Sequence, residues 1–277
     1  MVKKILVVGK NSLLAKNFIE TVNQNRHLGL YSCDHNEIPN EIQNYDVVIN
    51  FSFNPMLYTE EYKEEYDQDL KIARLVKDHG NIVLVTLSTR QVYGIHRELN
   101  FFKESDIDLN SEITTYGLNK IKCENNVKDC IDDNSRVLIC RSSNIFGNKI
   151  GGRNFVGIAL NSLVSKGIIK LNLDQNVIKD FLPIDSHSKI LESLIINNVA
   201  GTYNVGSGIK ISLGDLCSHF IKGYRSGRIE DTKIINDQFV LDITKINNQI
   251  DMNISSEEIL SYALNIGKTM RENKNAL

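Results

Sequence analysis

The sequence predicts an α/β fold, namely a Rossmann-type doubly wound parallel sheet with a small C-terminal lobe. Short apolar runs alternate with stretches of helical periodicity, and a glycine-containing turn follows the first run. Tyr116 and Lys120 lie four residues apart in a later helical stretch. With 277 residues and 42% hydrophobic content, the chain can bury the core of such a domain together with a smaller lobe.

Six apolar runs predict the strands of the sheet. They resemble fully buried strands, which are typical of parallel sheets covered by helices on both faces. The predicted strands are residues 5–8, 28–33, 46–51, 82–87, 136–140 and 201–205, and helical spacing predicts helices over residues 60–79 and 116–130. Ligands of such sheets bind at the carboxyl ends of the strands, so we expect the functional residues directly after strands.

The segment after the first run predicts a tight turn followed by a helix. Phe18, Ile19 and Val22 recur at helical spacing beyond this turn. Backbone N–H groups at the start of a helix bind anions, and a glycine lets the chain pass close to a diphosphate. An acidic residue at the end of the next strand can bind an adenosine ribose. The expected dinucleotide site consists of Gly9, Lys10, Asn11, Ser12, Leu13, Leu14 and Asp34.

The spacing of Tyr116 and Lys120 predicts a tuned acid/base pair. A four-residue step places both side chains on one face of a helix. The ammonium of Lys120 can then favour the ionised form of the Tyr116 phenol, whose ordinary pKa is about 10. We therefore expect Lys120 to lower the pKa of Tyr116, helped by a positively charged nicotinamide.

Composition and charge exclude several classes of protein. A net charge of −2 without a long basic run argues against nucleic acid or a membrane surface as a partner. The five cysteines form no Cys-x-x-Cys pair, so we expect neither a disulfide framework nor a metal site. The first apolar run is too short for the core of a signal peptide, and we expect a cytoplasmic protein.

Several segments, in order along the chain, match motifs of one family. VVGKNSLLA resembles a glycine motif, DVVINFSF the strand that passes under the cofactor, and STRQVYG a Ser/Thr segment. YGLNK and RSSNIFG resemble the motifs with the catalytic tyrosine and a substrate-contacting asparagine, and KDFLPIDSHSKIL, GTYNVGSG and FVLDITKI resemble later motifs. By these motifs the chain resembles the extended short-chain dehydrogenase/reductases, the NAD-dependent epimerase/dehydratase group that modifies nucleotide sugars, over nearly its whole length.

The resemblance implies roles for individual residues. Tyr116 is expected to be the catalytic acid/base, Lys120 to bind the nicotinamide ribose and tune Tyr116, and Thr89 to hydrogen-bond the reacting oxygen. It adds Phe51, Ser52 and Lys120 to the cofactor site. The residues expected to bind the substrate, a nucleotide-diphosphate sugar, are Thr89, Arg90, Asn144, Arg153 and Lys179.

Departures from the family pattern favour one reaction over its relatives. Sugar dehydratases of the family usually carry Asp and Glu after the catalytic Thr, whereas this chain has Arg90 and Gln91, so we do not expect dehydration. The leading hypothesis is reduction of a 4-keto nucleotide-activated sugar. A nucleotide-sugar 4-epimerase uses the same three catalytic residues and is the alternative.

A non-catalytic NAD(P)-binding regulator is the hypothesis from another class. Ser12 and Ala15 stand at usual glycine positions and favour it, but the intact catalytic residues oppose it. NAD(H) is the expected cofactor and NADP(H) the alternative, because Asp34 favours the free 2′-hydroxyl of NAD while Lys10 can meet a 2′-phosphate. Asp69 stands where an asparagine is usual.

The expected dinucleotide-binding domain consists of residues 1–148 and about 174–206. Residues 149–173 and 207–277 then form the substrate-binding lobe, with the glycine-containing stretch 147–157 at the boundary. For the oligomeric state, we consider a homodimer as the alternative to a monomer.

Overall fold

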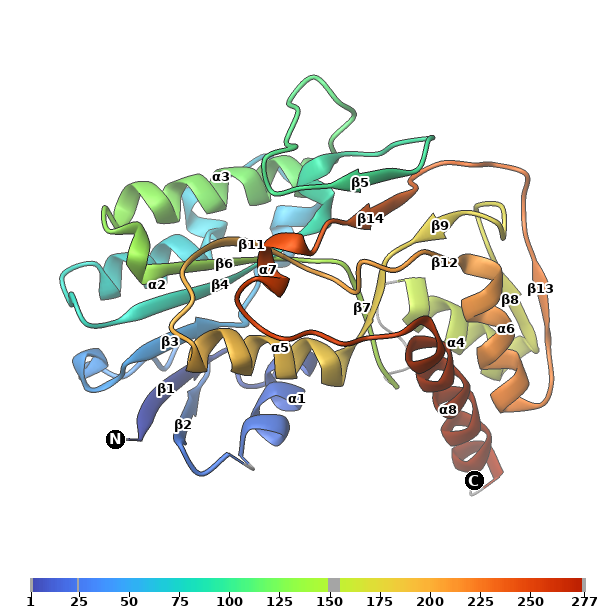
Figure 1. Ribbon diagram of the computed structural model, residues 1–277, viewed down its shortest axis with the longest axis horizontal. Helices are drawn as coiled ribbons and strands as arrows, with labels where there is room; N and C mark the ends of the chain where they lie inside the picture. The colour runs from blue at the N-terminus through green and yellow to red at the C-terminus, as the bar shows by residue number, and fades with distance from the viewer. Residues whose placement is uncertain (1, 24, 149–154, 276–277) are drawn as a thin grey trace.

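The computed structural model describes residues 2–23, 25–148 and 155–275. Six strands form one parallel sheet in the order β11-β6-β4-β3-β1-β2 (Figure 1). These strands are β1 (Lys3–Val8), β2 (Leu28–Cys33), β3 (Val47–Asn50), β4 (Val83–Thr89), β6 (Val137–Ser142) and β11 (Gly201–Val205). All six strands predicted from apolar runs are present, and the predicted α/β class is confirmed.

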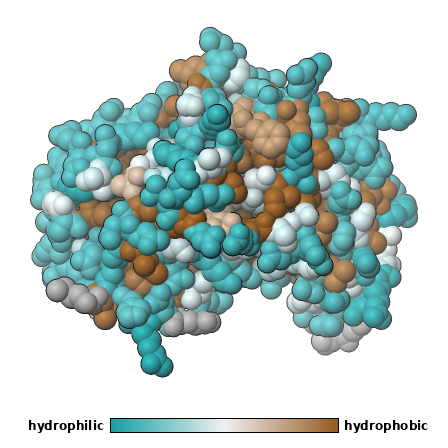
Figure 2. Space-filling view, in the orientation of Figure 1, coloured by the Kyte–Doolittle hydropathy of each residue, from teal (hydrophilic) through white to brown (hydrophobic). Residues whose placement is uncertain are grey.

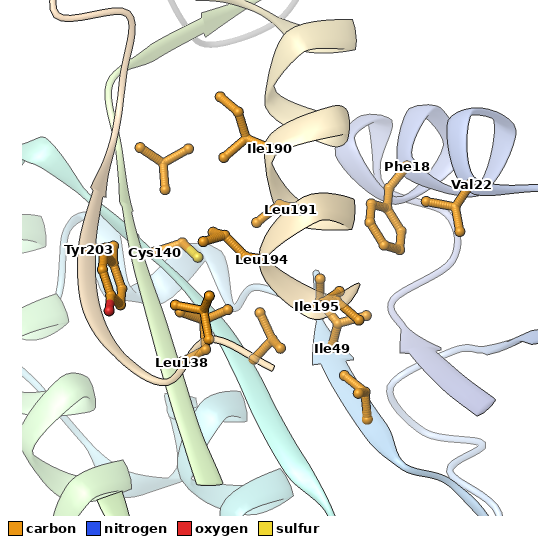
Figure 3. Close-up of a cluster of buried hydrophobic side chains, with 14 of the residues drawn as sticks. Phe18, Val22, Ile49, Leu138, Cys140, Ile190, Leu191, Leu194, Ile195 and Tyr203 are labelled. Carbon is orange, nitrogen blue, oxygen red and sulfur yellow. The ribbon is translucent and has the colours of Figure 1, made fainter. Parts of the chain in front are cut away.

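Helices cover both faces of this sheet. On one face lie α1 (Leu13–Val22) and α5 (Ile184–Ile196), which pack against each other and the sheet. Figure 3 shows Phe18 and Val22 of α1 and four α5 side chains meeting residues of β3, β6 and β11. On the other face, α2 (Gln68–Val76) and α3 (Thr115–Cys130) cover a second cluster of buried side chains from β1, β3, β4 and β6.

The helix predicted over residues 60–79 is shorter than expected. Residues 60–79 contain a helix only over α2, because the Asp67 side chain accepts a hydrogen bond from the Leu70 N–H and caps the helix there. The chain before Asp67 forms the 3-10 turns η2 (Pro55–Tyr58) and η3 (Glu64–Tyr66) instead. Helix α3 agrees with the prediction to one residue.

The strand order places the switch point of the sheet between β1 and β3. Residues 34–46 join β2 to β3 and contain only the 3-10 turn η1 (Ile42–Asn44). This connection is too short for a further helix and strand, so among the described residues β2 is the edge of the sheet. In open α/β sheets ligands bind where the strand order reverses, here at the carboxyl ends of β1 and β3.

A lobe with its own core adjoins the sheet (Figure 1). Its helices are α4 (Phe155–Lys166), α6 (Leu213–Tyr224) and α8 (Ser256–Asn275). Helices α6 and α8 touch through glycines: an added Cβ on Gly223 would lie 2.0 Å from the Leu264 carbonyl oxygen. None of the described helices combines the length and apolar character needed to cross a membrane.

Short strands connect the sheet to the lobe. They form the pairs β14 (Phe239–Leu241) with β5 (Asn100–Phe102), β10 (Phe181–Pro183) with β7 (Asn144–Phe146), β12 (Ile211–Ser212) with β9 (Ile178–Lys179), and β13 (Arg228–Glu230) with β8 (Ile168–Lys170). On the face shown in Figure 2, hydrophobic residues gather near the centre, where β14 and α7 (Thr244–Asn247) lie in Figure 1.

Residues 239–250 depart from the predicted division of the chain into a dinucleotide-binding domain and a lobe. We expected residues 207–277 to belong to the lobe. Phe239 and Leu241 instead pack with Val92 and Phe102 beside the sheet, and Ile246 joins the core between the sheet and α5. The chain therefore returns to the sheet over residues 239–250 before it enters α8, because these apolar side chains cover sheet residues. The division as a whole stays a prediction.

Candidate active site

A cavity of about 490 Å³ opens at the carboxyl ends of the central strands. Residues that follow β1, β3, β4 and β6 line it, as expected for a doubly wound sheet. Its polar lining consists of Ser12, Asn50, Ser52, Tyr58, Ser88, Thr89, Gln91, Tyr116, Lys120, Ser142, Ser143 and Asn144, and its apolar lining includes Leu13, Leu14, Phe51, Phe53, Phe146 and Phe181.

The glycine turn packs directly against the end of β3. Gly9 has a φ of 84°, and an added Cβ would lie 2.6 Å from the Ser52 nitrogen. Only glycine fits this close approach. The hydroxyl of Ser12 accepts a hydrogen bond from the Ala15 N–H at 3.1 Å and caps α1. Ser12, Leu13 and Leu14, at the start of α1, line the cavity. The first turn of a helix is where backbone N–H groups are available to an anion.

Acidic residues surround the position expected to meet the adenosine ribose. Asp34 accepts hydrogen bonds from the Asn11 side chain at 2.7 Å and from His35, and the bonds from His35 lower the pKa of Asp34. Lys10 turns toward Glu37, with 3.4 Å between Nζ and Oε2. Gly9 packs against Ser52 of the cavity wall, but Gly9, Lys10, Asn11 and Asp34 are not among the described residues that line the cavity. Lys10 already has an acidic partner.

Thr89 and Tyr116 are brought to the same cavity by close packing of two elements. Thr89 precedes the 3-10 turn η4 (Arg90–Tyr93) and accepts a hydrogen bond from the Gln91 N–H at 3.2 Å. Helix α3 approaches η4 at Gly117, where an added Cβ would lie 2.4 Å from the Gln91 carbonyl oxygen. The glycine beside Tyr116 therefore lets the start of α3 touch the end of β4.

The phenol of Tyr116 lies in an aromatic and largely buried environment. Its ring contacts Tyr58 in a tilted arrangement, with 4.5 Å between ring centroids, and meets Phe53 edge-on at 5.6 Å. Burial raises the pKa of Tyr116 above its ordinary value, and the charge of Lys120 lowers it only in part. Lys120 acts in the predicted direction, but burial has the larger effect and the pKa of Tyr116 is raised overall. The expected lowering, which includes the charge of a bound nicotinamide, stays a prediction.

Lys120 forms a buried ion pair. Its Nζ donates to Asp69 Oδ2 at 2.8 Å. Burial lowers the pKa of Lys120, and the Asp69 carboxylate more than compensates, so this pKa lies above its ordinary value. Asp69 Oδ1 accepts from the Asn50 side chain at 2.6 Å, and Asn50 accepts from the Ser52 N–H at 2.9 Å.

Asn144 lies on the cavity wall, as predicted, and Ser143 beside it was not anticipated. Asn144 begins β7, which pairs with β10. The hydroxyl of Ser143 is buried and has no hydrogen-bond partner among the described residues. A buried donor without a partner next to a cavity indicates a place where a ligand atom binds.

The structure does not bring the predicted basic substrate ligands to the cavity wall. Arg90 donates to both carboxylate oxygens of Asp237, at 2.5 and 2.7 Å, and Lys179 donates to the same carboxylate. Neither cation lines the cavity. Arg153 lies outside the described residues. The roles of these three side chains in substrate binding therefore stay predictions.

A second buried ion pair connects α3 to the sheet. Glu124 accepts from Arg141 Nη2 at 2.7 Å and from Nε at 3.0 Å, and it also accepts from the Ser88 hydroxyl. Arg141 further donates to the Glu104 carbonyl at 2.7 Å. Arg141 follows the strand predicted over residues 136–140, yet it serves the core and does not line the cavity.

Sequence reasoning missed residues whose motifs carry no recognisable signal. Asn50, Tyr58 and Ser143 line the cavity, but a single Asn, Tyr or Ser after a strand is common.

Asp67, Asp69 and Cys123 place possible ligand atoms within 4.8 Å of one another. Their carboxylates already accept hydrogen bonds from Tyr62 and Lys120, so we assign no metal to this group.

Comparisons with known proteins identify the family. The family model described as the RmlD substrate binding domain matches residues 3–178. No curated protein gives a significant match.

Solved structures share the fold at low sequence identity. The NAD complex of dTDP-glucose 4,6-dehydratase from Bacillus anthracis is 18% identical with a TM-score of 0.79, and the match covers 98% of each chain. UDP-glucuronic acid 4-epimerase from Bacillus cereus, with UDP-glucuronic acid and NAD, is 16% identical, with coverage of 96% of this chain and 99% of that one and a TM-score of 0.73. UDP-N-acetylglucosamine 4-epimerase from Bacillus cereus is 15% identical, with coverage of 97% and 99% and a TM-score of 0.76.

The family model covers more than half of the chain, and the matched solved structures share the fold over nearly all of it. The protein therefore belongs to the RmlD substrate binding domain family.

Proposed function

We propose that the protein is an NAD-dependent oxidoreductase that reduces a 4-keto nucleotide-activated sugar. The observation that carries this proposal is the convergence of Thr89, Tyr116 and Lys120 on one cavity with the start of α1. The cavity volume of about 490 Å³ lies within the range of roughly 300–1,000 Å³ that is typical of ligand pockets. Of the three solved structures compared above, two were determined with NAD, and all three carry the names of nucleotide-sugar enzymes.

The residues of the turn fit a dinucleotide. The close approach at Gly9 and the backbone N–H groups of the first turn of α1 suit the diphosphate, and Ser12 already caps the Ala15 N–H of that turn. Lys120 lines the same cavity from α3 and is held by Asp69, in reach of a nicotinamide ribose. A bound nicotinamide cofactor would supply the hydride.

NAD is favoured over NADP by the charges near the adenosine position. Asp34 and Glu37 both carry negative charge there, and Lys10 is paired with Glu37. A 2′-phosphate would meet a carboxylate and would have to compete for the lysine.

Tyr116 suits the role of proton donor in the reduction. Its raised pKa means that the phenol holds its proton at neutral pH and can give it to a carbonyl oxygen as that oxygen gains negative charge. Thr89 donates a hydrogen bond to the same oxygen, and Asn144, which also lines the cavity, binds the substrate.

The residues after Thr89 support reduction over dehydration. Elimination of water needs a base and an acid beside the sugar. Arg90 is turned to Asp237, and Gln91 has no titrating proton and accepts a hydrogen bond from Thr114 at 2.9 Å. Neither side chain can serve as the acid or base of an elimination.

A screen of nucleotide sugars with cofactor absorbance recorded tests the proposal. We expect NADH to be consumed with a nucleotide 4-keto sugar. Formation of a sugar isomer without net consumption of cofactor would identify the 4-epimerase. Binding of NAD without any conversion across the panel would favour the non-catalytic regulator.

A further inference from the structure

A hydrogen-bonded chain runs from α3 through α2 to the turn after β3. Its members are Lys120, Asp69, Asn50 and Ser52, joined at 2.8, 2.6 and 2.9 Å. All but Asp69 line the cavity. The side chains of Lys120 and Asp69 are only 6% and 10% exposed, so water does little to screen the charge of either one. Asp69 therefore contacts the proposed active site only through its partners.

The groups that act electrostatically on Tyr116 come from three elements. Lys120 and Cys123 lie on α3, Asp69 lies on α2, and Tyr58 lies on η2. After burial, which raises the pKa of Tyr116 most, Lys120 lowers it while the other three groups raise it. Asp69 opposes Lys120 in two ways: its charge acts on the phenol directly, and its ion pair neutralises the ammonium.

We infer that Asp69 is a positioning residue that fixes the Lys120 ammonium and offsets its charge, so that Tyr116 keeps its proton and works as an acid. The role of Tyr116 as an acid rests on the proposed function. The effect of Asp69 on the ionisation of Tyr116 does not rest on it. A buried lysine without this carboxylate would favour the phenolate more strongly, and the tyrosine would then lose its proton at a lower pH. The carboxylate on α2 limits this effect while it holds Lys120 against the cavity wall.

The test is a titration of Tyr116 itself. A polyfluorinated tyrosine placed at position 116 has an ordinarily lower phenol pKa and a fluorine NMR signal of its own. Asp69→Asn removes one negative charge and keeps the shape of the side chain, which the family resemblance indicates the fold can accept. We expect the ionisation midpoint to fall by about one pH unit or more, a tenfold change in the ionisation constant.

A neutral pair keeps the test decisive if the single variant does not fold. Asp69→Asn together with Lys120→Gln removes both charges and leaves no lone buried ion. We expect its Tyr116 midpoint to stay within about half a unit of the parent protein, because the two charges offset each other. A midpoint that rises by about one unit or more would overturn the inference, since Lys120 would then act on Tyr116 without opposition.

Asp67→Asn is the matched control. Asp67 is buried two residues before Asp69, but its carboxylate caps α2 and binds Tyr62. An asparagine caps a helix as well as an aspartate does. We expect this variant to leave the Tyr116 midpoint near that of the parent. If Asp69→Asn shifts the midpoint no more than this control does, the inference is wrong.

The titration needs neither substrate nor turnover, so it separates this inference from the proposed function. A shifted midpoint in a protein that converts no nucleotide sugar would sustain the role of Asp69 and remove the proposed reaction. If the protein is active, Asp69→Asn should also move the alkaline limb of its turnover to lower pH, because the phenol loses its proton earlier.

Discussion

Helix α3 contributes one member to each of two buried ion pairs, and the pairs differ in what their cations can still bind. Arg141 divides its donors among Glu124, Tyr93 and Glu104, so this cation is fully engaged in the core. Lys120 lines the cavity, and among the described residues its ammonium has one hydrogen bond, to Asp69. An ammonium has three donors. Burial therefore does not distinguish a functional cation from a structural one, whereas unused donors beside a cavity do.

Among the substitutions that test this comparison, we expect the largest effect on turnover at Tyr116, which lies at the end of α3 beside the cavity. Tyr116→Phe removes the proton donor and keeps the ring that packs against Tyr58. Turnover should fall by roughly 10² to 10⁴ with the thermal unfolding midpoint nearly unchanged. Steady-state rates and circular dichroism melts of both proteins check this. Near-normal turnover in the variant would remove Tyr116 from the chemistry.

At the other pair, a substitution should act on stability. Glu124→Ala leaves Arg141 buried without its carboxylate, and we expect a loss of about 3–5 kcal/mol in the free energy of unfolding. Urea unfolding measures it. Asp133→Ala, which removes a carboxylate that bonds only the nearby Ser135, is the control and should cost far less. A cost for Glu124→Ala that matched this control would mean that the Arg141 pair does not stabilise the core.

A smaller effect concerns the cofactor, which meets the turn before α1. Asp34 and Glu37 should make NADH bind at least as well as NADPH. Calorimetric titration of both cofactors checks this. A preference for NADPH of tenfold or more, about 1.4 kcal/mol, would contradict it and would point to Lys10 as the dominant contact.

The last prediction is a negative result, because we expect no dehydration product. Incubation with NAD and a panel of nucleotide hexoses should give no alkaline ultraviolet absorbance from a 4-keto-6-deoxy product. Arg90 is occupied by Asp237, and Gln91 cannot transfer a proton. A strong signal from any hexose would require another acid/base pair in the cavity lining.

The sequence predicts the sheet well because buried parallel strands are continuous apolar runs. The turn at Gly9 and helix α3 were also predictable, since a glycine after a strand and a helical side-chain pattern are visible within a few residues of sequence. The start of α2 was predicted too early, because apolar spacing continues through residues that Asp67 separates from the helix.

Long-range contacts within the site were not predictable. Arg90 and Lys179 both pair with Asp237, which is distant in sequence from Arg90 and follows no recognisable motif. The partner of Lys120 is likewise set by the packing of α2 against α3. The net effect on the Tyr116 pKa depends on burial, which four-residue spacing does not report.

Transfer of a labelled hydride tests the central claim most directly. NADH carrying deuterium at the transferable position of its nicotinamide is incubated with the protein and a nucleotide 4-keto sugar, and the product is analysed by mass spectrometry. The account predicts one deuterium in the sugar for each NADH consumed, and none with Tyr116→Phe above its residual rate. A sugar product that forms without deuterium and without loss of NADH would contradict it.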